Sequence, residues 1–176
     1  HASPHRLPGG FIGVDIFFVI SGFLITSILK KANEEKSFSL IGFYQRRIKR
    51  IFPSLLVVCA CSAIFGYLTL FPNEFAQLGK HIAGGVSFIS NFVLHSESGY
   101  FESSSDLKPL LHLWSLGIEE QYYIFFPVIL FLAYWRKVNP LRMIVGLTVL
   151  SFALSIYARN NLSFADGFYL PWFRFW

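Results

Sequence analysis

The chain has 176 residues, of which 54% are hydrophobic, 19% aromatic and only 14% charged. Soluble domains are about 45–50% apolar and about 25% charged, and a core of this size cannot bury so much apolar surface, so the composition excludes an ordinary soluble domain. The net charge of +5 does not indicate a nucleic-acid partner, because seven of the fifteen Lys and Arg lie between Lys30 and Arg50, flanked by apolar segments.

Apolar runs in the sequence predict an all-α, polytopic transmembrane helix bundle with about four or five spans. A span needs about 20 mostly apolar residues to cross about 30 Å of hydrocarbon. We expect Pro53 to lie in the first turn of the second span, where proline is tolerated. The predicted spans are Phe11–Leu29, Ile51–Phe71, Leu110–Tyr134 and Met143–Tyr157, with a fifth beginning near Phe168.

The weaker apolar stretch Lys80–Leu94 is predicted to be re-entrant or interfacial. Basic loops accumulate on the cytoplasmic side, which places Lys30–Arg50 and the segment from Arg136 to Arg142 there. An even number of crossings must separate these two loops, and two strong spans already supply it. The acidic segment Ser96–Pro109 is then expected outside the cytoplasm.

A basic cluster precedes the second span. Arg47 and Arg50 are three residues apart, and Arg46 and Arg50 are four apart, so their side chains are neighbours on a helix. Guanidinium groups offer planar forks of donors that suit phosphate. One interpretation is a site for a phosphate-bearing donor, and the other is a cytoplasmic anchor, including Lys49, that contacts lipid headgroups.

A polar stripe is predicted along the start of the third span. His112, Ser115, Glu119 and Tyr123 recur at steps of three, four and four residues, with Glu120 about 100° round the helix. Adjacent carboxylates in a span are unfavourable against lipid. In one interpretation a carboxylate is a general base or orients one. In the other it forms an interhelical hydrogen bond that stabilises the bundle.

The remaining polar groups carry weaker signals. Asp15 needs a partner inside the first span, and the nearby glycines favour close helix packing with a structural aspartate. Cys59 and Cys61 point about 200° apart on a helix and are interpreted as small apolar filler. His81 and His95 have no ligand-like spacing, and we expect no metal site.

Four segments together resemble the membrane acyltransferase-3 family, in the order in which that family carries them. The similarity spans essentially the whole chain. The motif sequences are most similar to those of bacterial O-acetyltransferases that modify lipopolysaccharide O-antigen or peptidoglycan. The segments are GGFIGVDIFFVISGFLIT at 9–26, FYQRRIKRIFP at 43–53, HLWSLGIEEQYY at 112–123 and FYLPWFRFW at 168–176.

The resemblance implies a membrane enzyme that transfers an acetyl group from acetyl-CoA to a surface glycan hydroxyl, with no permanently bound cofactor. His1 would be the catalytic histidine by its spacing ahead of the first motif, with His5 as competitor, and Glu119 its catalytic partner. The donor would bind Arg46, Arg47 and Arg50. Substrate-binding or structural roles would fall to Asp15, His112, Trp114, Ser115, Glu120 and Arg174.

The same resemblance implies a place in the bacterial inner membrane as a multi-pass protein. We expect residues 1–176 to be a partial acyltransferase-3 transmembrane domain, lacking the family's first helix and its later helices. The expected partners are the lipid bilayer, acetyl-CoA, a surface glycan acceptor and a fused periplasmic SGNH-type domain outside these residues. A proton-coupled transporter and a non-catalytic membrane scaffold are the alternatives.

Overall fold

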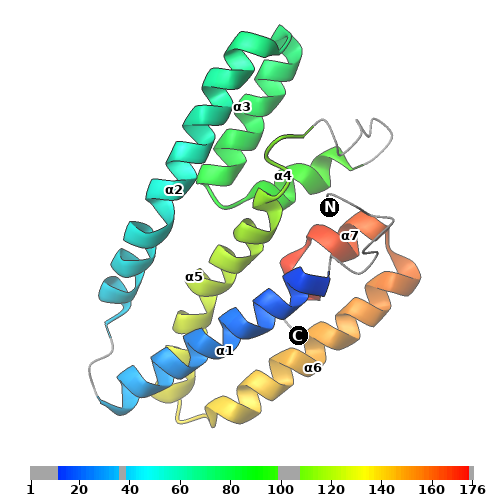
Figure 1. Ribbon diagram of the computed structural model, residues 1–176. Coiled ribbons are helices and arrows are strands. Elements are labelled where there is room, and N and C mark those ends of the chain that lie inside the picture. The colour runs from blue at the N-terminus through cyan, green and yellow to red at the C-terminus, as the bar shows by residue number, and fades with distance from the viewer. Residues whose placement is uncertain (1–11, 36–38, 99–107, 175–176) are drawn as a thin grey trace. The chain divides into compact units, whose positions relative to one another are not determined.

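The computed structural model describes residues 12–35, 39–98 and 108–174, and over these ranges the only regular secondary structure is helical. The chain forms two compact units, residues 1–43 and residues 44–176. Each unit is described by itself. Figure 1 shows the order of the helices along the chain.

The first unit consists mainly of helix α1, Ile12–Glu34. It confirms the first predicted span and continues past it, because Lys30 pairs with Glu34 at 3.9 Å across one turn. Polar side chains within the apolar part bond to their own helix, and the Thr26 hydroxyl donates to the Gly22 carbonyl at 2.7 Å. Asp15 lies in the first turn, where the helix dipole favours a negative charge.

Helix α2, Leu40–Thr69, joins the basic cluster and the second predicted span in one continuous helix of 30 residues. At 1.5 Å per residue it is about 45 Å long, more than the hydrocarbon thickness of a bilayer. The prediction that Pro53 lies in the first turn is therefore wrong. Pro53 is inside the helix, because the polar residues before it also adopt helical geometry and extend α2 toward the N-terminus.

The weak apolar stretch lies in two short helices, α3 (Pro72–Val86) and α4 (Ser90–Glu97). The break between them contains Phe88, whose φ of 57° lies in the left-handed region. In the part of the chain that the structure describes, four helices are long and apolar enough to cross a membrane. They contain Gly13–Ala32, Leu40–Thr69, Leu113–Trp135 and Pro140–Asn161. Neither α3 nor α4 is among them, in keeping with the expectation that this stretch makes no full crossing.

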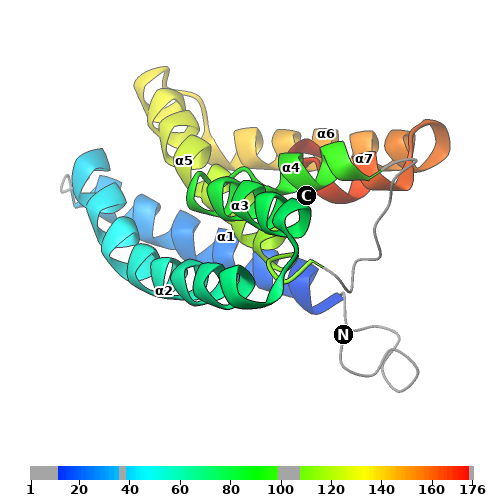
Figure 2. The same cartoon turned by 90° about the horizontal axis from the view of Figure 1, so that it is seen from above.

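Helices α5, Leu113–Trp135, and α6, Pro140–Asn161, are the third and fourth predicted spans. They are followed by α7, Phe164–Tyr169, and a 3₁₀ turn, η2, Pro171–Phe173. Near Phe168 the described residues form this short helix and turn, and Pro171 opens the turn. The fifth span stays a prediction. Both α7 and η2 pack on α6, and α7 also packs on α4, as Figure 2 shows from above.

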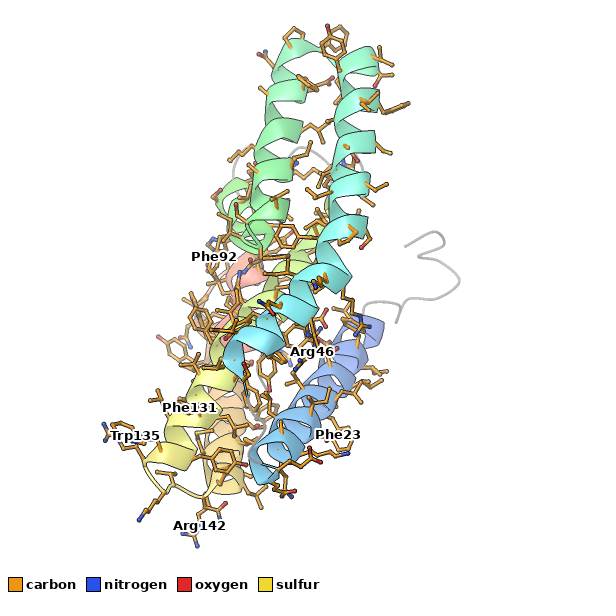
Figure 3. The ribbon with its side chains drawn as sticks, turned by 90° about the vertical axis from the view of Figure 1, so that its left-hand side faces the viewer. Phe23, Arg46, Phe92, Phe131, Trp135 and Arg142 are labelled. Carbon is orange, nitrogen blue, oxygen red and sulfur yellow. The ribbon has the colours of Figure 1, made fainter. Side chains whose placement is uncertain are left out.

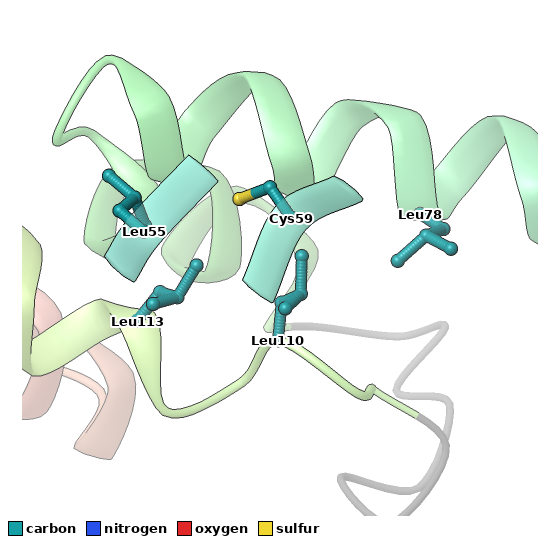
Figure 4. Packing of buried hydrophobic residues seen from close by; sticks show 5 residues of the cluster. All are labelled: Leu55, Cys59, Leu78, Leu110 and Leu113. Carbon is teal, nitrogen blue, oxygen red and sulfur yellow. The ribbon is translucent and has the colours of Figure 1, made fainter. Parts of the chain in front are cut away.

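Helix α5 is the central helix of the second unit. It runs antiparallel to α2, because Tyr44 contacts Ile124 near the start of α2 while a leucine-rich cluster joins the later part of α2 to the start of α5. This cluster, shown in Figure 4, contains Leu55, Cys59, Leu78, Leu110 and Leu113. Buried Cys59 is the apolar filler that we expected, and Cys61 is exposed.

The outer faces of the helices are apolar. Figure 3 shows Phe131 and Trp135 projecting from α5, and their exposed fractions are 49% and 67%. Similar large apolar side chains cover α2 and α6, including Phe65 at 69% and Val149 at 62% exposed. Exposed apolar surface of this extent is unfavourable in water, whereas the lipid tails of a bilayer solvate it. The protein is therefore a membrane protein.

Candidate functional site

The polar stripe of α5 is present, and its strongest link joins Glu119 to Tyr123. The Tyr123 hydroxyl donates a hydrogen bond to the Glu119 carboxylate one turn earlier on the same helix. At the start of the helix the Ser115 hydroxyl donates to the His112 carbonyl at 3.1 Å, and the His112 side chain is exposed. The stripe thus divides into an end where Ser115 bonds to the local backbone and a carboxylate–phenol pair further along the helix.

Helix α2 brings Arg47 onto this pair. The Arg47 guanidinium carbon lies 3.7 Å from the centroid of the Tyr123 ring, a cation–π contact worth about 0.5–2 kcal/mol. One turn earlier on α2, the Tyr44 hydroxyl donates to the Ile124 carbonyl at 2.8 Å. The second and third sequence motifs therefore meet in space through the face of a single tyrosine.

Glu120 adds a second carboxylate to the same region. Its side chain is only 5% exposed, and its Oε1 atom has no hydrogen-bond partner among the described residues. The charges of Arg47, Glu119 and Arg50 all act on it. A buried carboxylate oxygen without a donor is costly, so this part of the bundle is suited to receive a polar group that the described residues do not supply.

The cluster lies near the middle of α5 rather than at its end. Tyr123 is ten residues from Leu113 and twelve from Trp135, which corresponds to about 15 and about 18 Å along the axis. The second and third turns of α2 carry the arginines, and Tyr44 and Arg47 of the second turn contact the centre of α5. The cytoplasmic position of the arginines stays a prediction. Arg46 is exposed on α2 (Figure 3).

The opposite face of α5 carries an aromatic cluster. Trp114 is nine residues before Tyr123, so the two side chains point about 180° apart. The Trp114 ring packs on Phe168 with 4.5 Å between centroids. The Arg174 guanidinium lies 4.7 Å from the Phe168 ring centroid and 5.3 Å from that of Trp114, and its Nε donates to the Phe168 carbonyl at 2.9 Å.

This aromatic cluster joins the third motif to the fourth because the Trp114 ring contacts both Phe168 and the Arg174 guanidinium. The hydrogen bond from Arg174 to the Phe168 carbonyl lies within the fourth motif. A cavity of about 400 Å³ adjoins Phe168 and Arg174 between α6 and α7. Its lining includes Ser155, Arg159, Ser163, Gly167, Phe168 and Arg174.

A second ionic cluster surrounds Glu97 at the end of α4. Its carboxylate accepts hydrogen bonds from Lys80 and Lys108, each at 3.1 Å, and contacts His81 Nε2 at 2.8 Å. Burial alone would raise the pKa of Glu97, but the hydrogen bonds from His81, Lys108 and Lys80 outweigh it and lower the pKa to about 2. This cluster ties α3, α4 and the segment before α5 together.

His95 pairs with Asp166 in a similar way, with 2.6 Å between Nε2 and Oδ1. This contact lowers the pKa of Asp166, and bonds from Ser163 lower it further. Local sequence spacing could not predict these two histidine–carboxylate pairs, because the partners of His81 and His95 lie 16 and 71 residues away. Within the described ranges, His, Cys, Asp and Glu side chains form no group of three that could hold a metal ion.

Three candidate residues are not placed relative to this cluster. His1 and its competitor His5 lie outside the described residues, so the histidine assignment stays a prediction. Asp15 belongs to the first unit, which is described by itself. The residue that our sequence reasoning missed is Tyr123 as the direct partner of Arg47. Its place on the polar stripe was visible, but the contact between helices was not.

The sequence of the chain is similar to those of known proteins over most of its length. A family model for an acyltransferase domain matches residues 3–176. Over 139 residues the chain is 45% identical to an uncharacterized protein of Haemophilus influenzae, covering 79% of this chain and 56% of that protein. Over 159 residues it is 35% identical to the O-acetyltransferase OatA of Staphylococcus aureus, covering 89% of this chain and 26% of that protein.

The chain therefore spans about half or less of the length of these relatives. No solved structure is significantly similar to it. The match to the family model covers nearly every residue, including both faces of α5 and the arginines of α2. The chain belongs to the acyltransferase-3 family of membrane proteins.

Proposed function

We propose that the complete protein is a membrane O-acyltransferase of the bacterial inner membrane. It transfers an acetyl group from acetyl-CoA to a hydroxyl of a cell-surface polysaccharide, such as lipopolysaccharide O-antigen or peptidoglycan. Membership of the acyltransferase-3 family supports the reaction class, and the name of the relative OatA supports an oxygen acceptor.

The observation that carries the proposal is the connection from Arg47 through Tyr123 to Glu119. Guanidinium groups bind phosphate in a planar, bidentate way, and acetyl-CoA carries phosphates at the end opposite its thioester. A carboxylate can hold and charge-stabilise an imidazole. Helices α2 and α5 therefore carry the two kinds of group that the reaction needs, guanidinium groups for the donor phosphates and a carboxylate for the proton transfer.

In the proposed reaction, Arg47 and Arg50, assisted by Arg46, hold the donor phosphates. The family histidine, His1, takes the proton from the acceptor hydroxyl while the oxygen attacks the thioester carbonyl. The carbon–sulfur bond breaks, and the thiolate of coenzyme A leaves with that proton. His1 could alternatively carry the acetyl group between the two substrates. Glu119, held by Tyr123, stabilises the charged imidazole.

Depth in the bundle favours this chemistry. Charge interactions are stronger away from water, and the cluster lies beside the middle of α5. A donor that enters from the cytoplasm and an acceptor that enters from the other side could meet there, and holding both would supply much of the rate enhancement. A site that binds only lipid headgroups would not require the contacts from Arg47 through Tyr123 to Glu119.

The experiment uses the complete protein with alanine at Arg47 or Arg50, and Lys49→Ala as the matched control. Lys49 belongs to the same basic segment, but it is exposed and points about 160° away from Arg47 on the helix. We expect surface O-acetylation to be abolished in both arginine variants and retained in Lys49→Ala, at equal protein levels in the membrane. Normal acetylation in both arginine variants would rule out the donor site.

A transporter is tested in the same membranes by counterflow of labelled acetyl-CoA. Exchange of intact acetyl-CoA across the membrane, without acetylated product, would favour transport over transfer.

A further inference from the structure

A buried amide lies where three helices of the second unit meet. Asn91, the second residue of α4, is 0% exposed. Its Nδ2 donates to the Tyr169 carbonyl at the end of α7 at 3.0 Å. Its Oδ1 accepts from Gln121 Nε2 of α5 at 2.8 Å. One side chain thus connects α4, α5 and α7.

The surroundings of this amide are shaped to hold α5 closely. Gln121 Nε2 also donates to the Phe88 carbonyl at 2.7 Å, and Phe88 has the left-handed φ of 57°. Gly117 lies one turn before Gln121. A Cβ at Gly117 would be 3.1 Å from Asn91 Oδ1 and 3.3 Å from the Phe88 carbonyl oxygen, so only glycine leaves room for this approach.

The amide contacts determine the rotation of α5 about its own axis. Gln121 lies midway in sequence between Glu119 and Tyr123, and each of these points about 160° away from it. The face of α5 that is bound to Asn91 is therefore opposite to the face that meets Arg47. With the first face held by the two hydrogen bonds of Gln121, the carboxylate–phenol pair is presented toward α2.

We propose that Asn91 is a positioning residue for acyl transfer, which acts through Gln121 to set the rotation of α5. This inference rests on the proposed function. A rotation of about 20° moves a side-chain tip, about 5–6 Å from the helix axis, by about 2 Å. Displacements of about 1 Å at a reacting group can cost about 100-fold in rate. Loss of the amide should therefore reduce turnover without touching the donor.

The test compares Asn91→Ala with Ser90→Ala in the complete protein. Ser90 is the adjacent residue, is 4% exposed, and has a hydroxyl without a hydrogen-bond partner among the described residues. We expect kcat of Asn91→Ala to fall at least 10-fold, with KM for acetyl-CoA changed less than about 3-fold. Ser90→Ala should keep the wild-type constants. Equal kcat in wild type and Asn91→Ala would overturn the inference.

A second readout separates positioning from a purely structural role. If Asn91 acts through Glu119 and Tyr123, the kcat effects of Asn91→Ala and Tyr123→Phe will overlap, and the double variant will be little slower than the slower single variant. Effects that multiply would contradict the inference. If Asn91→Ala does not accumulate in membranes, Gln121→Met removes the same bond at similar volume, and the same two outcomes apply.

The result also distinguishes this inference from the proposed function. A wild-type protein that transfers no acetyl group would defeat the proposed function itself. An active wild type whose activity depends on Arg47 but not on Asn91 would defeat only the positioning role.

Discussion

Tyr123 makes two contacts that substitution can separate. Its hydroxyl donates to Glu119, and its ring faces the Arg47 guanidinium at 3.7 Å. Tyr123→Phe removes the first contact and keeps the second, whereas Tyr123→Leu removes both. The pair of variants therefore measures the carboxylate and the guanidinium separately, at a position that retains an apolar side chain in each case.

The expected effects follow from the strengths of the two contacts. A hydrogen bond to a charged group contributes about 1.5–3 kcal/mol, so Tyr123→Phe should lower kcat by about 10- to 150-fold. The cation–π contact contributes about 0.5–2 kcal/mol, so Tyr123→Leu should raise KM for acetyl-CoA by a further factor of about 2 to 30. The two changes fall on different kinetic constants because Glu119 serves the proton transfer and Arg47 the donor.

The assay is transfer of labelled acetyl groups to the acceptor in membrane vesicles, with acetyl-CoA varied. Tyr122→Phe is the control, because Tyr122 lies about 100° round the helix and stacks on Phe126 with 4.7 Å between centroids. It should change kcat less than about 3-fold. Wild-type kcat in Tyr123→Phe, or equal KM in Tyr123→Phe and Tyr123→Leu, would refute the assignment of these two roles.

Two further predictions concern stability, measured as thermal unfolding in detergent. Glu97→Gln should destabilise the protein by about 1–3 kcal/mol at neutral pH, because charge-assisted hydrogen bonds are lost. The pKa of Glu97 is lowered to about 2 from an ordinary 4.5, so the wild-type advantage should be complete above about pH 4.5 and vanish as the pH falls through about 2. A difference independent of pH would contradict this origin. Gly117→Ala should lower the free energy of unfolding by about 1–3 kcal/mol, because the added Cβ would crowd Asn91 and Phe88. Gly146→Ala is the control and should be neutral or slightly stabilising, because a Cβ there meets nothing within 4 Å. Equal unfolding temperatures for the two alanine variants would contradict the close approach at Gly117.

Much of the fold was predictable because the bilayer imposes a length and a polarity on each span. The runs at 11–29, 110–134 and 143–157 agree with α1, α5 and α6 within a few residues at most ends. The start of α2 was not predictable from hydropathy, since Leu40–Arg50 is polar yet helical. Hydropathy also did not indicate the turn at Pro171–Phe173, because an aromatic run reads as apolar whether or not it is helical.

The candidate site divides in the same way. Helical periodicity alone placed Glu119 and Tyr123 on one stripe, since residues four apart lie on one face. The spacing of the arginines showed that they are neighbours, but it could not show what they face. Asn91 carried no signal in the sequence, because an isolated amide in an apolar segment has no local pattern that names its partners.

The sequence by itself determined that this is a helical membrane protein and that it carries the four family motifs. These properties depend on composition and on contacts between residues close along the chain. Only the tertiary structure decided that Arg47 stacks on Tyr123, that Trp114 packs on Phe168, and that Asn91 contacts both α5 and α7. Such contacts join residues 30 to 80 positions apart, and their geometry depends on how the helices pack rather than on any local preference.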